Sequence, residues 1–373
     1  MFTYDTCPIM LLREIATLFN RKALYLIGAG ASISYLNPQY SNFFNDAKKL
    51  IEQYSPFSGI TLNQDYQLKE NEIIKFKISG FPYQINFHHN KYFIDTTEFD
   101  FYDYLLCEKL KFETPRVLDV AIALSCSLDQ YPIRCYEYQI FNLMNSSSVI
   151  ANYNHDNLIN KFVENKIKII NLHGVVSPEF KKYIMDNLDS LITSNISIFS
   201  EKIVLANKEY ESDLNKNAEF ASFVKELEQN NFDYIVILGY SFFGIGNDIL
   251  DIVSYEQICQ YLSDHPNCRI IIIDPCSRKL PDFFSSKLKL KNIRLFNIEW
   301  DSFTFAFFKT HQFKANNKIF KFSAIDLNRF IYFYSIYSRN REIFKKYNNS
   351  ISEECMDENN RLIRLCGHKN IYW

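Results

Sequence analysis

An amide and an imidazole each follow a short apolar run of this chain. Asn154 ends the segment Val149-Ile-Ala-Asn-Tyr-Asn154, and His173 stands nineteen positions later, at the end of Ile169-Ile-Asn-Leu-His173. A neutral imidazole with an ordinary pKa of about 6.5 accepts a proton near neutral pH, and an amide holds a hydroxyl or a water without changing its charge. Together the two groups could carry out acid–base chemistry. Taken alone, a histidine at a strand end could equally be a structural hydrogen-bonding residue.

Glycine is scarce in this chain, with 9 in 373 residues, and most of it stands in three clusters. The clusters contain Gly28 and Gly30, then Gly174, then Gly239, Gly244 and Gly246. Glycine is needed where the backbone takes a positive φ or approaches a ligand closely. The turn Gly28-Ala-Gly-Ala-Ser32 follows an apolar run, so its N–H groups could donate to a pyrophosphate. A tight turn between a strand and a helix explains the same residues without a ligand, and both interpretations stay open.

Composition limits the expected partners and location. Lys and Arg total 41 against 43 Asp and Glu, a net charge of -2, which gives no overall field to attract nucleic acid. The 9 cysteines form no CxxC pair and their number is odd, which favours reduced thiols. The N-terminal residues have no basic stretch before an apolar one, and no run reaches the ~18 apolar residues of a membrane span. We therefore expect a soluble cytoplasmic protein that binds neither nucleic acid nor membrane directly.

Apolar periodicity predicts alternating strands and helices. Strands are expected at 23–27, 148–152, 167–172, 203–205, 234–238, 269–274 and 292–298, and helices at 9–19, 37–54, 156–164, 218–228 and 248–261. This alternation is typical of an α/β fold with a Rossmann-like, doubly wound parallel sheet. In such a sheet the ligand crevice lies at the carboxyl ends of the strands, where the glycine turn, Asn154 and His173 would meet.

Two further parts are expected around this sheet within a first domain of residues 1–300. An α/β insertion at about 56–145 would contain a hairpin of strands 74–78 and 83–87 and helices at 99–110 and 117–128. Residues 301–373 would form an aromatic-rich, helical C-terminal appendage, with one helix capped near Ser323. The aromatic helices could be core, a subunit interface or a cofactor shelf, and we expect core.

In the order of its motifs the chain resembles the sirtuin superfamily. The motifs are Gly28-Ala-Gly-Ala-Ser32, Asn154-His-Asp156, Leu172-His-Gly174, Gly239-Tyr-Ser241 and Ile273-Asp-Pro275. More narrowly, the segments Asn-His-Asp-Asn-Leu-Ile and Gly-Tyr-Ser are similar to those of bacterial sirtuin-like NAD hydrolases of antiphage defence. The specificity of the resemblance lies in the order of the motifs and not in any one of them.

The resemblance implies a role for each motif in binding NAD. The expected NAD-binding residues are Gly28, Ala29, Gly30, Ala31, Ser32, Asp156, Gly239, Tyr240, Ser241 and Asp274. Ser241 would reach a phosphate or ribose oxygen, and Asp274 the adenosine ribose. Asn154 would hold the nicotinamide ribose hydroxyls or an attacking water, and His173 would be the general base. Asp156 would orient the loop or serve only as an acid at a helix N-terminus.

The chain also departs from the family pattern. Deacylating sirtuins bind a structural zinc through two cysteine pairs, whereas this chain has no cysteine between Cys135 and Cys259, so no metal is expected. Tyr153 stands where the family has Thr or Gln, and the Pro-Asp-Phe-Arg segment after the first loop has no counterpart. Protein deacylase or ADP-ribosyltransferase activity is therefore the least favoured reading.

The expected function is an NAD(P)+ hydrolase that cleaves the nicotinamide N-glycosidic bond and leaves ADP-ribose. It would act as an NAD-depleting effector in bacterial antiphage defence, with NAD as its substrate. A homo-oligomer, or a partner defence protein such as a ring ATPase, an argonaute or another sensor, would control it. The alternative is a non-catalytic subunit that binds NAD or ADP-ribose and regulates a defence complex.

Overall fold

The structure is a computed structural model that describes a defined part of the chain. The described residues are 3–32, 73–78, 81–88, 91–95, 128, 131–132, 134–164, 166–187, 218–240, 242, 251–275, 293–310 and 322–341. For 73–78, 81–88 and 91–95 it describes the backbone alone. The helices expected at 37–54 and 99–110, and the strand expected at 203–205, lie outside the described residues, as does the helix expected at 117–128 apart from its last residue.

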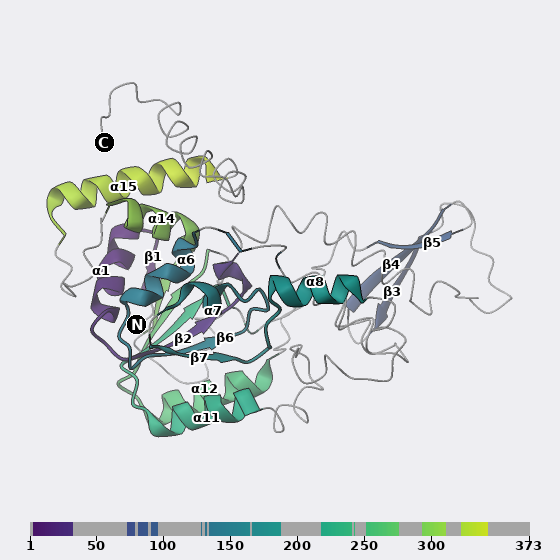
Figure 1. Ribbon diagram of the computed structural model, residues 1–373, viewed down its shortest axis with the longest axis horizontal. Coiled ribbons are helices and arrows are strands. Elements are labelled where there is room, and N and C mark those ends of the chain that lie inside the picture. The colour runs from purple at the N-terminus through teal and green to yellow at the C-terminus, as the bar shows by residue number, and fades with distance from the viewer. Residues whose placement is uncertain are drawn as a thin grey trace.

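Seven parallel strands form the central sheet (Figure 1). They are β1 (Thr3–Asp5), β2 (Ala23–Ile27), β6 (Val149–Asn152), β7 (Lys168–Asn171), β8 (Tyr234–Leu238), β9 (Arg269–Ile273) and β10 (Ile293–Phe296), in the order β7-β6-β2-β8-β9-β10-β1. The chain runs from the central β2 outward to β7 and then returns to β8 beside β2, which is the order of a doubly wound sheet. The expected Rossmann-like α/β fold is confirmed.

The central strands form because they bury side chains on both faces. In β2, Tyr25 and Ile27 face one hydrophobic core, while Leu24 and Leu26 face the other. All five residues of β2 are buried, as are all five of β8. A continuous apolar run of this length suits a strand covered by helices on both sides.

Helices cover both faces of the sheet. One face carries α1 (Pro8–Leu18), α6 (Tyr136–Gln139), the 3-10 helix η3 (Ile140–Leu143), α7 (Leu158–Phe162), α14 (Trp300–Thr310) and α15 (Ala324–Arg339). The other carries α11 (Ala218–Gln229) and α12 (Ile252–Asp264), which lie below the sheet in Figure 1. A further helix, α8 (Pro178–Asp186), follows β7. Among the described residues, no helix has the length and apolarity needed to cross a membrane.

The two C-terminal helices belong to the same core as β2. Phe303 and Phe307 of α14 are fully buried, and Phe330 of α15 packs edge-on against Phe303 at 5.5 Å between ring centroids. Ser323 caps α15 in a capping box with Asp326, as the sequence predicts. The aromatic residues of these helices are therefore core residues.

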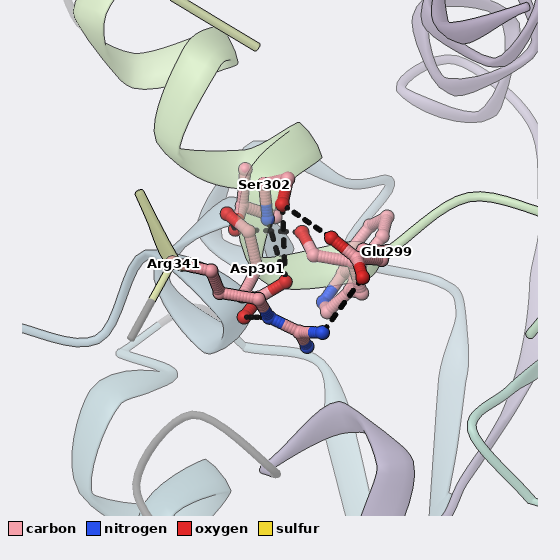
Figure 2. Close-up of polar contacts among 6 residues, drawn as sticks. Glu299, Asp301, Ser302 and Arg341 are labelled. Atoms are coloured by element: carbon pink, nitrogen blue, oxygen red, sulfur yellow. Dashed lines mark hydrogen bonds and ion pairs between the residues drawn. The ribbon is translucent and has the colours of Figure 1, made fainter. Parts of the chain in front are cut away.

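An ion-pair cluster fastens the end of α15 to the start of α14. Arg341 donates through Nε to Oδ2 of Asp301 at 2.6 Å and through Nη1 to Oε1 of Glu299 at 2.8 Å. Ser302 donates from its amide to the other carboxylate oxygen of Asp301 and from its hydroxyl to Glu299. Figure 2 shows the guanidinium reaching both carboxylates. We call these four residues the C-terminal clamp.

Three antiparallel strands form a second sheet, β3 (Ile73–Ile78), β4 (Phe81–His88) and β5 (Lys91–Asp95), drawn well apart from the main sheet in Figure 1. The predicted hairpin corresponds to β3 and β4 and is confirmed. The alternation in the sequence did not predict β5. Its short run Lys91-Tyr-Phe-Ile-Asp95 carries charged residues at both ends, so it lacks the signal of the other two strands.

Two parts of the main fold also differ from the sequence prediction. The edge strand β1 is three residues long and pairs with β10. Its sequence Thr-Tyr-Asp is too short and too polar to show an apolar pattern, so the sequence did not predict it. Residues 135–144 were expected in the insertion, but Tyr138 and Phe141 are buried in the core of the main sheet. The main fold therefore resumes before the expected boundary at 145.

Candidate functional site

The described candidate residues gather at one edge of the sheet. Gly28 follows β2, Asn154 follows β6, His173 follows β7, Gly239 follows β8, and Asp274 follows β9. In a parallel sheet these are the carboxyl ends, and β2 and β8 are the neighbours at which the chain reverses direction across the sheet. Ser241 lies outside the described residues.

The glycine turn after β2 packs directly on the turn after β8. A Cβ at Gly28 would lie 2.5 Å from the carbonyl oxygen of Gly239, and one at Gly30 would lie 2.8 Å from the Gly239 Cα. Gly239 itself has φ +56, in the left-handed region. Close approach of two backbones is therefore sufficient to require glycine at all three positions.

The amides of this turn are used within the protein. Gly28 donates to the carbonyl of Leu238 at 2.9 Å, and Gly30 donates to that of Gly239 at 3.0 Å. Ala31 and Ser32 donate to carbonyls of the same turn, whose residues Ala29–Ala31 form the 3-10 helix η1. In this conformation the geometry supports the tight turn, since these four amides do not point at a ligand.

Asn154 is buried and its orientation is defined by its neighbours. Nδ2 donates to the carbonyl of Gly28 at 2.9 Å, to the Tyr138 hydroxyl at 2.9 Å and, more weakly, to Ser32 Oγ at 3.2 Å. A carbonyl can only accept, so the nitrogen and not the oxygen of the amide must face Gly28. Among the residues that the structure describes, none donates to Oδ1. The acceptor side of the amide is thus the part that remains for a ligand.

A second asparagine, which the sequence motifs did not single out, brackets the backbone of Asn154. Asn152, the last residue of β6, accepts from the Asn154 amide at 3.1 Å and donates to the Asn154 carbonyl at 3.0 Å. It also donates at 2.9 Å to Asn171, its register partner on β7. The only sequence signal for this pair is that β6 and β7 both end in asparagine.

His173 is buried with both ring nitrogens facing polar atoms. Nδ1 lies 3.1 Å from the carbonyl oxygen of Tyr153, and Nε2 lies 3.4 Å from Oδ2 of Asp251. The Tyr240 hydroxyl donates to the same carboxylate oxygen, and the Tyr240 ring stacks on Tyr153 at 3.9 Å between centroids. Because the Tyr153 carbonyl only accepts, this contact assigns a hydrogen to Nδ1, and Nε2 is the nitrogen that faces Asp251.

Asp251 is therefore a site residue that the sequence did not reveal. It is buried, it stands immediately before α12, and it lies in space beside a histidine that is 78 positions earlier in the chain. An acid before a helix resembles many ordinary helix starts. Its pairing with His173 becomes visible only when β7 and β8 are placed on the two sides of β6 and β2.

His155, the middle residue of the motif Asn154-His-Asp156, is buried against His173. The two rings stack at 5.9 Å between centroids. Burial lowers the pKa of His155 to about 3, with a smaller contribution from the charge of the neighbouring His173. The nearby backbone of Gly174 and His173 raises the pKa and offsets a part of this fall. No hydrogen bond to either ring nitrogen is formed within the described part of the chain. His155 is thus a neutral ring at physiological pH.

Asp156 lies on the Asn154 side of the cluster. Its Oδ1 accepts from the amide of Leu158 at 2.9 Å, at the start of α7. Burial raises the pKa of Asp156 to about 6, and the Ser32 hydroxyl and the Leu158 amide partly offset that rise. Its Oδ2 has no hydrogen-bond partner in the described residues. The sequence predicted a helix over 156–164 that includes Asp156, but α7 begins at Leu158, so Asp156 precedes the helix.

The remaining candidates lie at the rim. Asp274 is partly exposed at the end of β9, and its amide donates to the carbonyl of Phe296 at 3.1 Å. In the described parts of the chain, no group of three or more His, Cys, Asp or Glu side chains is arranged to hold a metal ion. No protein-family profile matches the sequence, and no curated protein matches it significantly.

Proposed function

We propose that this protein hydrolyses the nicotinamide N-glycosidic bond of NAD(P)+, giving nicotinamide and ADP-ribose. One observation carries the proposal. Around Asn154 and His173, buried polar atoms of His155, Asp156 and Asp251 lack hydrogen-bond partners in the described residues. Buried polar groups are rarely left unsatisfied in folded proteins, and a cluster of them at the carboxyl edge of a doubly wound sheet favours a ligand with several polar groups.

The resemblance to sirtuin-like NAD hydrolases then selects the ligand. The residues that carry the resemblance, Asn154-His-Asp156 and Leu172-His-Gly174, are the ones that form this cluster. The acceptor side of Asn154 suits a ribose hydroxyl or a water, because both can donate to Oδ1. Asp274, at the rim, suits the second ribose of a dinucleotide.

The reaction needs a leaving group, a nucleophile and a proton acceptor. Cleavage of the C–N bond sends its electron pair to the pyridinium nitrogen, so nicotinamide leaves as a neutral molecule. A water then bonds to the oxocarbenium-like carbon of the ribose, and its proton passes to Nε2 of His173. Asp251 at 3.4 Å balances the resulting imidazolium charge. Positioned acid–base help of this kind contributes roughly 10²- to 10⁴-fold.

The proposal includes a resting state that limits turnover. Both ring nitrogens of His173 face protein atoms in this structure, so Nε2 must turn partly away from Asp251 to reach a substrate or a water. This suits an effector of antiphage defence that is held inactive in the cytoplasm until a homo-oligomer or a partner protein triggers it.

Release of nicotinamide from NAD or NADP tests the proposal directly. The purified chain is incubated with each dinucleotide, alone and with the products of neighbouring genes. Asn154→Ala and His173→Ala should each lower the rate by about 100-fold or more. His265→Gln is the matched control, because both ring nitrogens of His265 likewise lie against protein oxygens, but the residue follows α12 and is outside the cluster. Undiminished rates in Asn154→Ala and His173→Ala would contradict the proposal.

The engagement of His173 also favours a second candidate, a regulatory subunit that binds NAD or ADP-ribose without cleaving it. An imidazole kept against Asp251 would bind a ribose but accept no proton. Calorimetric binding of NAD or ADP-ribose, with no nicotinamide formed under any condition, selects this candidate. Binding lost in Asn154→Ala would place the ligand in the same cluster.

A further inference from the structure

Two buried hydroxyl groups, those of Tyr138 and Ser32, are hydrogen-bonded to the side-chain amide of Asn154. Nδ2 of Asn154 has two hydrogens, and its two shortest bonds go to the Gly28 carbonyl and the Tyr138 hydroxyl, both at 2.9 Å. The Tyr138 hydroxyl is also hydrogen-bonded to Ser32 Oγ.

One arrangement of hydrogens gives both hydroxyl groups and the Asn154 amide a partner. Because the Tyr138 oxygen accepts from Asn154 and the group is fully buried, its own hydrogen must be donated to Ser32. Burial raises the pKa of Tyr138 well above its usual value, so the phenol keeps its proton. The Tyr138 hydroxyl thus accepts from Asn154 and donates to Ser32.

Tyr138 owes its place to the C-terminal helices. Its helix, α6, is bonded to α14 by Trp300, whose Nε1 donates to the carbonyl of Glu137 at 3.0 Å. Tyr136 of α6 stacks on Phe308 of α14 at 4.9 Å between centroids. The helix α15 covers α14, and Figure 2 shows the C-terminal clamp that joins them.

We propose that Tyr138 is a positioning residue of the active site, which fixes the Asn154 amide with Oδ1 toward the substrate, and that the C-terminal helix pair serves to hold it there. Tyr138 lies 16 positions before Asn154 and outside every motif of the site. Its hydroxyl acts on Asn154 and not on the substrate. The proposal rests on the proposed function only in that Asn154 contacts the substrate.

Tyr138→Phe tests the proposal because it removes the hydroxyl and keeps the ring. Tyr25→Phe is the matched control: Tyr25 is also a fully buried tyrosine of the same core, it packs on Phe141, and it does not touch Asn154. The first readout needs no activity. The side-chain amide signals of Asn154 are measured by 15N NMR, assigned by their absence in Asn154→Ala, and the exchange of their hydrogens with solvent is timed.

We expect hydrogen exchange at the Asn154 side chain to quicken about tenfold or more in Tyr138→Phe and to stay unchanged in Tyr25→Phe, because loss of the Tyr138 acceptor frees one of the two N–H groups. The second readout is nicotinamide release. In Tyr138→Phe, kcat should fall by roughly 10- to 100-fold with little change of KM, as expected when a group is misplaced and not removed.

The outcomes separate the two proposals. Unchanged Asn154 exchange in a folded Tyr138→Phe protein overturns the positioning role. A wild-type protein that releases no nicotinamide, but whose Asn154 exchange quickens in Tyr138→Phe, refutes the hydrolase and leaves the positioning role standing. If Tyr138→Phe does not fold, Ser32→Ala is measured instead, because it removes the hydroxyl that is bonded to both Tyr138 and Asn154. An unchanged Asn154 exchange in Ser32→Ala would overturn the proposal equally.

Discussion

The imidazole of His173 lies 3.4 Å from the carboxylate of Asp251, and both side chains are almost completely buried. The Tyr240 hydroxyl donates a hydrogen bond to the Asp251 carboxylate, and the Tyr240 ring stacks on Tyr153. The backbone carbonyl of Tyr153 faces Nδ1 of His173. His173 and these three residues thus contact one another in a closed cycle that includes the imidazole. A proton that arrives at Nε2 thus creates a cation with a counterion already in place, in a setting where an unpaired buried charge is costly.

The first prediction concerns Asp251→Asn, which keeps the shape of the side chain and removes its charge. We expect the rate of nicotinamide release to fall by about 100-fold, since the imidazolium loses the carboxylate that balances it. The measurement is kcat/KM for NAD at neutral pH. Glu256→Gln is the control, an exposed acid on the same helix, α12, for which we expect the wild-type rate. A wild-type rate in Asp251→Asn would remove the ion pair from the mechanism.

The second prediction concerns the acid stability that depends on His155. Its folded pKa of about 3 is below the ordinary value of 6.5, so the unfolded chain takes up a proton first as the pH falls. The contribution of His155 to stability is present above pH 6.5 and is lost as the pH falls toward 3. Relative to His155→Phe, the unfolding free energy of the wild type should drop by about 1.4 kcal/mol per pH unit in that window.

Urea unfolding of both proteins between pH 4 and pH 7 measures this slope, and the difference between them isolates residue 155. His265→Phe, which replaces a partly exposed histidine outside the site, is measured in the same way as the control substitution. A pH-independent difference between wild type and His155→Phe would mean that His155 is not kept neutral by burial.

The third prediction concerns Asp156, for which the sign is opposite. Its folded pKa of about 6 is above the ordinary value of 3.8, so the folded protein holds the proton more tightly. The stability linked to this group is full below pH 3.8 and is lost as the pH rises through 6. Relative to Asp156→Asn, the wild type should therefore lose stability between about pH 4 and pH 6 and show no further change above pH 7.

The same urea titration detects it, and Asp264→Asn, an exposed acid at the end of α12, is the control. A wild type that gains stability relative to Asp156→Asn as the pH rises would show that the carboxyl is stabilised in its ionised form.

Local patterns predicted the sheet well and the site only in part. The strands β2 and β8 begin and end where the apolar runs of Ala23–Ile27 and Tyr234–Leu238 do, because both are buried on two faces and stop at glycine. Asn154 and His173 were identifiable because strand ends in a parallel sheet converge. For these elements local chemistry and the global fold agree.

The missed residues depend on contacts between distant segments. The clearest examples are Asp251, which meets His173 across the sheet, and Tyr138, whose short helix α6 is placed by α14. Neither has a local pattern that differs from an ordinary helix start or an ordinary core tyrosine. The glycines at 28 and 30 left two interpretations open at the level of sequence, since a phosphate loop and two turns packed together require the same residue type.

The last prediction concerns the C-terminal clamp. Asp301 is buried, whereas Arg341 is partly exposed, so Arg341→Met leaves a buried carboxylate with Glu299 as a neighbour of the same charge. We expect a loss of about 2–4 kcal/mol of unfolding free energy, near the lower part of the range for buried pairs because solvent screens the arginine. In the double variant Asp301→Asn with Arg341→Met, part of this loss should be regained, since the unpaired charge is gone.

Chemical denaturation of the two single variants and the double variant gives the coupling energy. Arg269→Met is the control, because Arg269 contacts the ring and hydroxyl of Tyr234 and forms no ion pair with the clamp. If α15 holds α14 and α14 holds α6, Arg341→Met should also quicken exchange of the Asn154 side-chain amide while Arg269→Met leaves it unchanged. If exchange of the Asn154 side-chain amide is unchanged in Arg341→Met, the C-terminal clamp contributes to stability but does not position Asn154.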